Sequence, residues 1–359
     1  MSHRLFIFTF TFLLVACTPH SVEEFSPTET SLPPATSVPA AQTPAPELVS
    51  TETASLPGQL EIIQPVNLMH LQLLKTFPAE IPLQNSAVAI SPDGKTMAIG
   101  SNSTATIFFI DLASGNPLQN MQINTQFNGP FDVIEYLADG SLLASSAKGY
   151  ESYHIDVNGD ILFTWGYPFA ISADGKTVAF GDNMGTTLVD IISSEPLGSL
   201  DGNVVLNLSF SPDGSKLAVS TAGVDYLTSY VWDVASQTLL ATLNETGEAR
   251  FSPDGKFLIT TSGEGQLNSL KIFDADGKTQ LTTLTDSQGL KGIAPLLSPD
   301  GQMIAAQTPT GRPVAWNTTN WQSLNMPALE GQLDLFSPDG RILITRTSDG
   351  GVLFWGVLP

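Results

Sequence analysis

The chain contains few of the residues on which several common functions depend. Its 359 residues include one cysteine and four histidines, and 14 lysine and arginine residues stand against 35 aspartate and glutamate residues. A single cysteine excludes an internal disulfide. The formal net charge of −21 argues against nucleic-acid binding, which needs basic side chains to neutralise phosphates. It argues equally against adhesion to anionic lipid through the folded part of the chain.

The few histidines give little support for a zinc site or for a histidine-containing catalytic triad. Only His70 and His154 lie beyond the N-terminal 58 residues, and neither has a second histidine or a cysteine at ligand spacing. No Gly-x-Ser-x-Gly motif indicates a serine hydrolase. Two acidic runs, residues 156–160 and 274–277, could bind calcium, but neither matches an EF-hand loop, and Asn-Gly or Asp-Gly hairpin turns are the simpler interpretation. We predict no metal and no cofactor.

What the sequence does contain is one short turn motif in many copies. Ser-Pro-Asp-Gly begins at residues 91, 211, 252, 298 and 337, and relaxed versions begin at 137 (Leu-Ala-Asp-Gly) and 172 (Ser-Ala-Asp-Gly). Proline presets φ, aspartate tolerates the bridge region and glycine takes a positive φ, which together form a type I turn that ends in a left-handed residue. Apolar and polar residues alternate on both sides, as in residues 208–221, so each copy predicts a β-hairpin.

The spacing of these turns predicts the fold class. Their glycines fall at 94, 140, 175, 214, 255, 301 and 340, which gives gaps of 46, 35, 39, 41, 46 and 39 residues. A period of about 40 to 45 residues with a hairpin in each unit is typical of a propeller blade, and no segment shows sustained helical periodicity. We therefore predict an all-β protein, a seven-bladed β-propeller of four-stranded antiparallel blades, over residues 59–359.

The third strand of several units ends in an aliphatic or aromatic residue followed by aspartate. The pairs are Ile110-Asp111, Val189-Asp190, Trp232-Asp233 and Phe273-Asp274. In these features the chain resembles the WD40 family and the looser bacterial WD40-like and TolB-type propellers, over about residues 68–359. Only Trp232-Asp233 is a literal Trp-Asp pair, and no Gly-His dipeptide occurs. The hydrogen-bonded tetrad of orthodox WD40 blades therefore cannot be assembled in the way the family builds it.

The seventh unit stops after its third strand. Residues 69–77, which include His70, have no hairpin of their own and resemble the outer strand of other units. We predict that residues 71–77 pair with residues 351–355 and close the ring, with His70 on the same closing strand. Closure would remove the exposed strand edges that otherwise invite aggregation. The alternative is that residues 71–77 are only the end of a linker.

The N-terminus predicts secretion and a lipid anchor. Residues 5–16 are apolar and follow Arg4, a run too short to span a bilayer but suited to a secretory signal. Residues 14–17, Leu-Val-Ala-Cys, look like a bacterial lipobox, and by that resemblance Cys17 carries the lipid. The alternative is an incidental cysteine in an ordinary signal. We expect a lipoprotein signal peptide at 1–16, a disordered Pro/Thr/Ser-rich tether at 17–58, and a location on the extracytoplasmic side of the cell membrane.

These features together predict a monomeric, non-catalytic platform for a protein partner. The resemblance places most partners on the propeller face that carries the loops between second and third strands and the connections between blades. Aromatic residues, the usual binding anchors, gather in these loops in the second to fourth units, although several could instead cap the core at strand ends. The candidates are Phe127, Phe131, Tyr150, Trp165, Tyr167 and Tyr226.

Two other functions stay open. The first is an extracytoplasmic propeller enzyme, lactonase-like or glycan-active, with a site in the central channel. Glu135, Arg250 and Asp334 are unusual charges on predicted inner strands and are candidates for such a site. The second is a TolB-like component of an envelope complex with a membrane-protein partner. Clustered carboxylates with a bound ion would favour the enzyme, and a wide aromatic patch would favour the platform.

Overall fold

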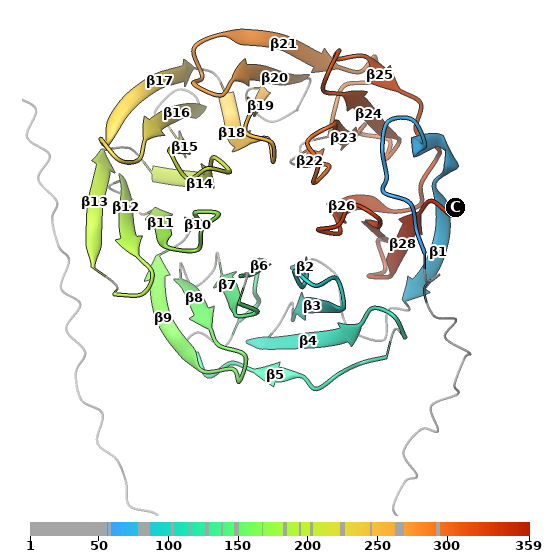
Figure 1. Cartoon of the computed structure of the whole chain (residues 1–359), viewed down its shortest axis with the longest axis horizontal. Coiled ribbons are helices and arrows are strands. Elements are labelled where there is room, and N and C mark those ends of the chain that lie inside the picture. Colours follow the sequence, from blue (N-terminus) through green and yellow to red (C-terminus); the bar gives the residue numbers. More distant parts are fainter. Residues whose placement is uncertain are drawn as a thin grey trace, which may run out of the picture. The chain divides into compact units, whose positions relative to one another are not determined.

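The computed structural model shows a ring of seven four-stranded antiparallel sheets (Figure 1). The predicted all-β class and seven-bladed architecture are confirmed. The predicted signal peptide and Cys17 lie outside the described residues, as does nearly all of the predicted tether. The structure describes residues 56, 59–77, 87–101, 104–114, 116–125, 129–137, 139–146, 151–166, 168–181, 185–193, 195–201, 204–222, 227–244, 246–262, 269–291 and 295–359.

In each blade the first strand lies nearest the ring axis and the fourth lies outermost (Figure 1). The first blade contains β2 (Val88–Ile90), β3 (Thr96–Gly100), β4 (Thr106–Asp111) and β5 (Met121–Gln122). The second contains β6 (Val133–Tyr136), β7 (Leu142–Ser146), β8 (Glu151–Ile155) and β9 (Ile161–Gly166). The third contains β10 (Phe169–Ile171), β11 (Thr177–Gly181), β12 (Gly185–Asp190) and β13 (Pro196–Asp201).

The remaining blades follow the same order until the last, which takes its outer strand from the N-terminal side of the ring. The fourth contains β14 (Val204–Phe210), β15 (Lys216–Ala222), β16 (Leu227–Asp233) and β17 (Thr238–Asn244). The fifth contains β18 (Thr246–Phe251), β19 (Phe257–Ser262), β20 (Ser269–Asp274) and β21 (Gln280–Thr285). The sixth contains β22 (Leu296–Leu297), β23 (Met303–Gln307), β24 (Pro313–Asn317) and β25 (Ser323–Leu324). The seventh contains β26 (Gln332–Phe336), β27 (Leu343–Arg346), β28 (Val352–Gly356) and β1 (Gln72–Phe77).

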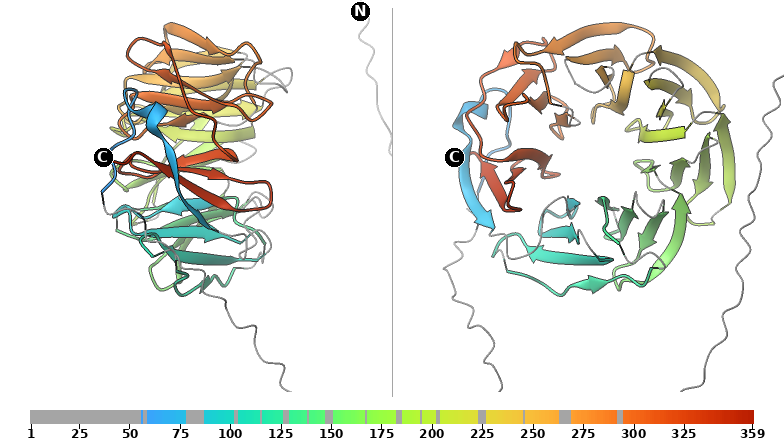
Figure 2. Two further views of the ribbon diagram at one scale, coloured as in Figure 1. Left: turned by 90° about the vertical axis from the view of Figure 1, so that its right-hand side faces the viewer. Right: turned by 180° about the vertical axis from the view of Figure 1, so that it is seen from behind.

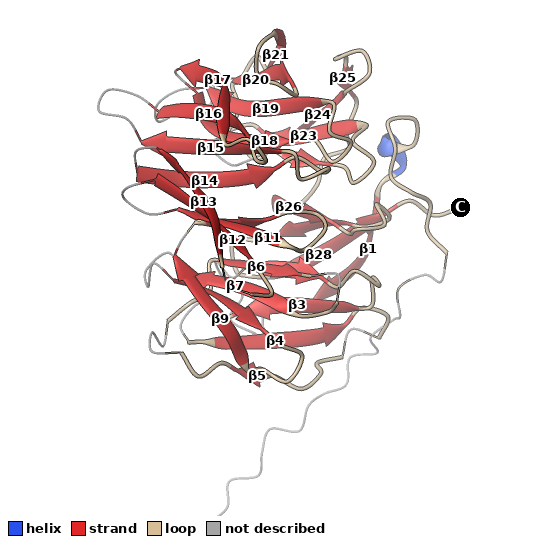
Figure 3. Ribbon diagram, turned by 60° about the vertical axis from the view of Figure 1, so that its left-hand side comes forward, coloured by secondary structure: helices blue, strands red, loops and turns tan. Residues whose placement is uncertain are grey.

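Seen from the side, the strands run between two faces that carry the connections (Figure 3). We call the side with the first-to-second and third-to-fourth strand connections the turn face. The side with the second-to-third strand connections and the links between blades is the loop face. Within the described residues the one helical element is a short 3₁₀ turn, η1 (Leu68–His70), and no helix there is long and apolar enough to cross a bilayer.

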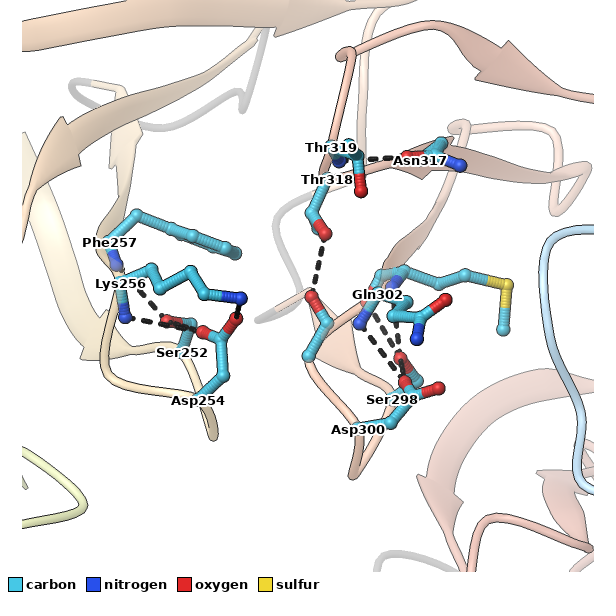
Figure 4. A network of polar contacts seen from close by, with 12 residues as sticks. Ser252, Asp254, Lys256, Phe257, Ser298, Asp300, Gln302, Asn317, Thr318 and Thr319 are labelled. Atoms are coloured by element: carbon cyan, nitrogen blue, oxygen red, sulfur yellow. Dashed lines mark hydrogen bonds and ion pairs between the residues drawn. The ribbon is translucent and has the colours of Figure 1, made fainter.

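The repeated motif owes its serine and aspartate to a local hydrogen-bond network. In the fifth blade the Ser252 hydroxyl donates to Asp254 at 2.7 Å and accepts the Phe257 N–H at 3.1 Å, while the Lys256 N–H donates to Asp254 at 3.2 Å (Figure 4). Ser252 is fully buried, so its hydroxyl satisfies a backbone N–H that water cannot reach. The same serine-to-aspartate bond recurs in five other blades, at Ser91, Ser172, Ser211, Ser298 and Ser337.

The motif glycines have the expected left-handed conformation. All seven have positive φ, between 67° and 87°. Gly301 shows a second requirement, because an added Cβ would lie 2.8 Å from the Asp254 Cγ of the preceding blade's turn. The turns of neighbouring blades therefore pack against each other, and the turn face repeats nearly the same structure around the ring.

The second blade departs from the motif and shows how the network adapts. Leu137 stands in the serine position, and the hydroxyl after the glycine, Ser141, donates to Asp139 at 2.6 Å instead. That hydroxyl also meets His154 Nε2 at 2.9 Å. His154 is buried and lies parallel to the Trp165 ring at 6.2 Å. Burial lowers the pKa of His154. The contacts of the imidazole with Ser141 and Trp165 give it a structural role in the second blade.

The first and last strands close the ring as predicted. β1 pairs antiparallel with β28, with Phe77 opposite Val352 and Gln72 opposite Gly356, one residue away from the predicted C-terminal range. Phe77 is 5% exposed, and its ring centroid lies 4.7 Å from that of Phe354. Figure 2 shows β1 along the outer edge of the last blade. The prediction for His70 was wrong, because His70 ends the 3₁₀ turn that precedes the strand.

Buried hydroxyl groups replace part of the missing tetrad. In the seventh blade the Trp355 indole N–H donates to Thr345 Oγ1 at 2.8 Å, and that hydroxyl donates to the Glu330 carbonyl at 2.6 Å. In the fourth blade Ser220 and Ser229 pair at 3.0 Å, and Ser229 donates to the Gly247 carbonyl at 2.7 Å. The last hydrogen bond of each of these chains is accepted by a backbone carbonyl, that of Glu330 in the link before β26 and that of Gly247 within β18.

The apolar core lies between the blades. One cluster joins the seventh blade to the first and contains Phe77, Met97, Ile99, Ile344 and Phe354. Another joins the first and second blades around Phe131 and Tyr153. Each blade thus packs its faces against those of its neighbours. Polar groups that carry function are left to the loops and to the inner strands.

Candidate functional site

A cavity opens on the loop face of the sixth and seventh blades. Its volume is about 500 Å³. It is bordered by the link before β22, the β23–β24 connection, the link before β26 and the β27–β28 connection. β22 and β26 lie side by side near the axis (Figure 1). The lining residues are Lys291, Gln307, Gly311, Glu330, Gly331, Gln332, Leu333, Asp334, Arg346, Thr347 and Ser348.

An ion pair forms the most buried charged part of this cavity. Arg346 Nη2 lies 2.6 Å from Asp334 Oδ1, and the two side chains are only 23% and 15% exposed. Burial raises the pKa of the Asp334 carboxyl, and the Arg346 guanidinium opposes that rise. The other carboxylate oxygen, Oδ2, is buried and accepts no hydrogen bond from the described part of the chain. The site therefore holds a carboxyl group whose ionisation is costly.

A β-bulge brings this pair together. The β26–β27 register pairs Leu333 with Thr345 and Leu335 with Ile344, so Asp334 is the extra residue between two paired positions. A bulge locally re-aims the side chain of the extra residue. Arg346 lies opposite Gln332 in the same hairpin. The bulge therefore brings Asp334 and Arg346 together. The alternation of apolar and polar residues in the sequence does not predict such a bulge.

The Gln307 side chain ties the cavity wall together. Its amide nitrogen donates to the Gly311 and Gly331 carbonyls at 3.0 and 2.9 Å, and its oxygen accepts the Leu333 N–H at 3.1 Å. Gln307 is 6% exposed, so these bonds are shielded from water. They link the sixth blade to the entry of the seventh and keep the cavity walls in fixed positions.

The accessible rim of the cavity carries both signs of charge. Lys291 Nζ donates to Gln332 Oε1 at 3.2 Å, and both residues are exposed. Glu330, in the link that leads into β26, is also exposed. The lining therefore contains two cations, Lys291 and Arg346, and two carboxylates, Glu330 and Asp334, and its formal charge is zero.

Comparisons with known proteins agree with this architecture. No protein-family model matches the sequence. An uncharacterized WD repeat-containing protein of Synechocystis sp. is 27% identical over 207 residues, which cover 56% of this chain and 55% of that protein. A WD repeat-containing protein of Schistosoma mansoni is 29% identical over 167 residues, which cover 42% of this chain and 53% of that protein. The chain is a seven-bladed β-propeller that is similar to WD repeat-containing proteins. It spans about half the length of the curated relatives it matches.

A solved structure with lower sequence identity to this chain has a similar fold. Hydrazine synthase of Kuenenia stuttgartiensis matches with a TM-score of 0.61 and 18% identity, over 77% of this chain and 96% of that chain. At this identity the likeness concerns the fold alone.

Two of the aromatic candidates are core residues of the propeller. Phe131 is 1% exposed, and its ring meets Tyr153 edge-on at 6.2 Å. Trp165 is 9% exposed and stacks on Phe163 at 5.7 Å. Neither side chain is available as an exposed anchor, which corrects their assignment to a binding face. The other four, Phe127, Tyr150, Tyr167 and Tyr226, lie outside the described residues.

The other candidate charges do not join the cavity around Asp334. Glu135 lies on β6 and is exposed. Desolvation of its carboxyl by nearby protein raises the pKa of that group, and the charge of Arg250 opposes the rise. Arg250, on β18, is 3.4 Å from Glu248. The structure thus separates the three predicted charges into the Asp334 cavity and a second group near the axis.

The two acidic runs form hairpin turns, as the simpler interpretation held. In the first, the Asp156 N–H donates to the Asp160 carbonyl at 2.9 Å, and the Asp156 carboxylate accepts the Asn158 N–H at 2.9 Å. In the second, the Gly277 N–H donates to the Asp274 carbonyl at 2.9 Å. No group of three or more histidine, cysteine or acidic side chains with metal-binding geometry occurs in the described part of the chain.

Proposed function

We propose that this WD40-like propeller is a lipid-anchored, extracytoplasmic, non-catalytic platform that captures a protein partner on its loop face. The contrast between the two faces of the ring carries the proposal. The turn face repeats one hydrogen-bonded motif from blade to blade. The second-to-third strand connections on the loop face range from three to six residues and the links between blades from one to ten, and their sequences differ from blade to blade. Specific recognition needs a surface that does not repeat, so the loop face is the side suited to a partner.

The entry of the chain into the ring supports the same orientation. The Leu56 N–H donates to the Ala113 carbonyl at 3.1 Å, and Ala113 lies in the connection between β4 and β5 on the turn face. Chain that arrives from an N-terminal anchor would therefore reach the ring on the face opposite the loop face. A partner could approach the loop face without meeting the point of attachment.

Alanine substitution of the three loop tyrosines should abolish partner capture. We expect the Tyr150→Ala/Tyr167→Ala/Tyr226→Ala variant to lose at least about tenfold in crosslinked partner, because aromatic anchors at the centre of an interface contribute about 2 kcal/mol or more. The measurement is crosslinking in intact cells followed by mass spectrometry of what co-purifies. The thermal midpoint should stay unchanged.

The control for this experiment lies on the turn face. Val157 and Ile192 are 66% and 78% exposed there, so Val157→Ala/Ile192→Ala removes exposed apolar area of a similar kind. This control should capture the partner as the wild type does. Capture that survives in the tyrosine variant, or is lost in the control, would show that the loop face is not the binding face.

Replacing Cys17 should release the protein from the membrane. Each buried CH₂ of an acyl chain contributes about 0.8 kcal/mol, so a multiply acylated cysteine binds a membrane stably. We expect Cys17→Ser, expressed behind a cleavable secretory signal in place of residues 1–16, to move from the membrane to the soluble fraction. Thr18→Ser behind the native signal is the control and should stay with the membrane. Cys17→Ser that still sediments with the membrane would refute the anchor.

A further inference from the structure

We propose that the cavity of the sixth and seventh blades binds a neutral, polyhydroxylated ligand the size of one or two sugar residues. The protein partner proposed above plays no part in this site. The cavity volume, about 500 Å³, lies within the range of small-molecule sites. That volume suits one or two sugar rings and is too small for a folded partner.

The charge balance of the lining selects against charged ligands. A cationic ligand would meet Lys291 and Arg346, and an anionic one would meet Glu330 and Asp334 together with the field of a protein of net charge −21. The two signs cancel within the cavity itself. A neutral ligand is repelled by neither kind of group. It can still accept hydrogen bonds from the cations and donate hydrogen bonds to the carboxylates.

Eight of the eleven lining residues have side chains that can form hydrogen bonds. Leu333 is its single apolar side chain beyond the glycines, and Leu333 is itself buried at 6% exposure. An apolar ligand would therefore strip water from polar groups without replacing its hydrogen bonds. A polyol is better matched, because each hydroxyl both donates and accepts.

Lys291, Glu330 and Asp334 can form hydrogen bonds with adjacent hydroxyl groups of one ligand. The Lys291 ammonium has three N–H donors, of which one faces Gln332 at 3.2 Å. The Glu330 carboxylate, exposed on the rim, accepts only. The Asp334 carboxyl makes its bond to Arg346 through Oδ1, while Oδ2 has no hydrogen-bond donor in the described protein.

The cavity is already formed before any ligand arrives. The three hydrogen bonds of Gln307 fix the walls, and the bulge at Asp334 fixes the ion pair at its base. Gly331 allows no side chain, since an added Cβ would lie 2.6 Å from the Arg346 carbonyl oxygen. A preorganised polar site loses little free energy to ordering on binding.

The test uses the chain from residue 17 onward with named sugars as probes. Glucose, galactose, mannose, N-acetylglucosamine, maltose and cellobiose are each titrated at millimolar concentrations and followed by saturation-transfer NMR and by thermal shift. We expect at least one of them to bind the wild type and to raise its melting midpoint. Lys291→Ala/Gln332→Ala should weaken that sugar about tenfold or more, because two hydrogen bonds at the rim are lost.

Two further variants keep the outcome interpretable. Lys278→Ala/Gln302→Ala removes exposed residues of the same types from the turn face and should bind the sugar as the wild type does. Ser348→Trp fills the cavity mouth from an exposed loop and should abolish binding with a normal melting midpoint. The proposal is overturned if no probe binds the wild type or if binding persists in both cavity variants. Preferential binding of L-argininamide or acetate at this cavity would overturn it too.

Discussion

Removal of β1 should leave a chain that aggregates instead of a closed ring. We expect deletion of residues 18–86 to abolish the cooperative melting transition and the monomer peak in size-exclusion chromatography. Deletion of residues 18–54, which stops before the first described residue, should change neither. The two deletions share their start and differ by residues 55–86, which are the closing strand and the segments on either side of it.

The expected loss is large for two physical reasons. First, β28 would lose its outer partner and expose a row of unpaired backbone groups next to a buried apolar face. Second, Leu68, Leu71 and Phe77 would leave the clusters in which they are buried at 1%, 7% and 5% exposure. Removal of one such side chain costs about 2–5 kcal/mol, and whole domains are stable by only about 5–15 kcal/mol.

A point substitution measures the same effect on a smaller scale. Phe77→Ala should lower the free energy of unfolding by about 3–5 kcal/mol, because the ring packs on Phe354 in the cluster between the last and first blades. Thr76→Ala, at the exposed neighbouring position, should change it by less than about 0.5 kcal/mol. A truncated chain that stays monomeric, with Phe77→Ala as stable as wild type, would show that β1 does not close the ring.

The local parts of this fold could be predicted from the sequence because their causes are local. The Ser252 turn is determined by bonds that span five residues or fewer, and its glycine is required by backbone sterics alone. Seven such turns indicate seven blades, and the last unit lacks a fourth strand. An unpaired N-terminal strand is then expected to supply it and close the ring. The pairing of β1 with β28 therefore needed no knowledge of side-chain contacts.

The candidate site was predicted only in part, because its contacts are either irregular or distant in sequence. Asp334 stood out as a charge on an inner strand, but its pairing with Arg346 depends on a bulge. The wall built by Gln307 joins segments 24 residues apart, and the Thr345 network joins residues 15 apart. Short motifs do not report contacts of that kind.

The aromatic residues show a different limit. Phe131 and Trp165 were assigned to loops. Phe131 does lie in the link before β6, but its side chain is buried, and Trp165 lies within β9. A shift of one or two residues at a strand end decides whether a large ring covers the core or faces solvent. Element ends are the least certain part of any sequence interpretation, so aromatic content alone could not separate a core cap from a binding anchor.

Substitution of Arg346 should destabilise the protein at neutral pH in a way that acid partly reverses. We expect Arg346→Met to lower the free energy of unfolding by about 3 kcal/mol, because breaking a mostly buried pair leaves the Asp334 carboxylate without its counter-charge. The double variant Arg346→Met/Asp334→Asn should recover most of this loss, since it leaves no buried charge. The measurement is denaturant unfolding of the wild type and the three variants of the cycle.

The pH dependence identifies the carboxyl group as the cause. Burial raises the pKa of Asp334 in the folded protein above its ordinary value, and Arg346 holds that rise in check. Without Arg346 the folded-state pKa rises further, so the folded variant takes up a proton at higher pH than the unfolded chain does. The destabilisation is then fully present above the folded-state pKa, shrinks as the pH falls through it, and disappears below the unfolded value.

The comparison must be made between variants, because other carboxyl groups act in the opposite direction. Hydrogen bonds from Ser211 and Ser215 lower the pKa of Asp213 to about 2, and groups of this kind lose their stabilising effect as the pH falls. These carboxyl groups are present in every member of the cycle, so their effects cancel when the free energies of unfolding of two variants are subtracted. The difference between wild type and Arg346→Met should therefore decrease with acidification, and it should be small at every pH for the double variant. A difference that does not change with pH would assign the loss to packing of the arginine side chain and would contradict a buried, ionised Asp334.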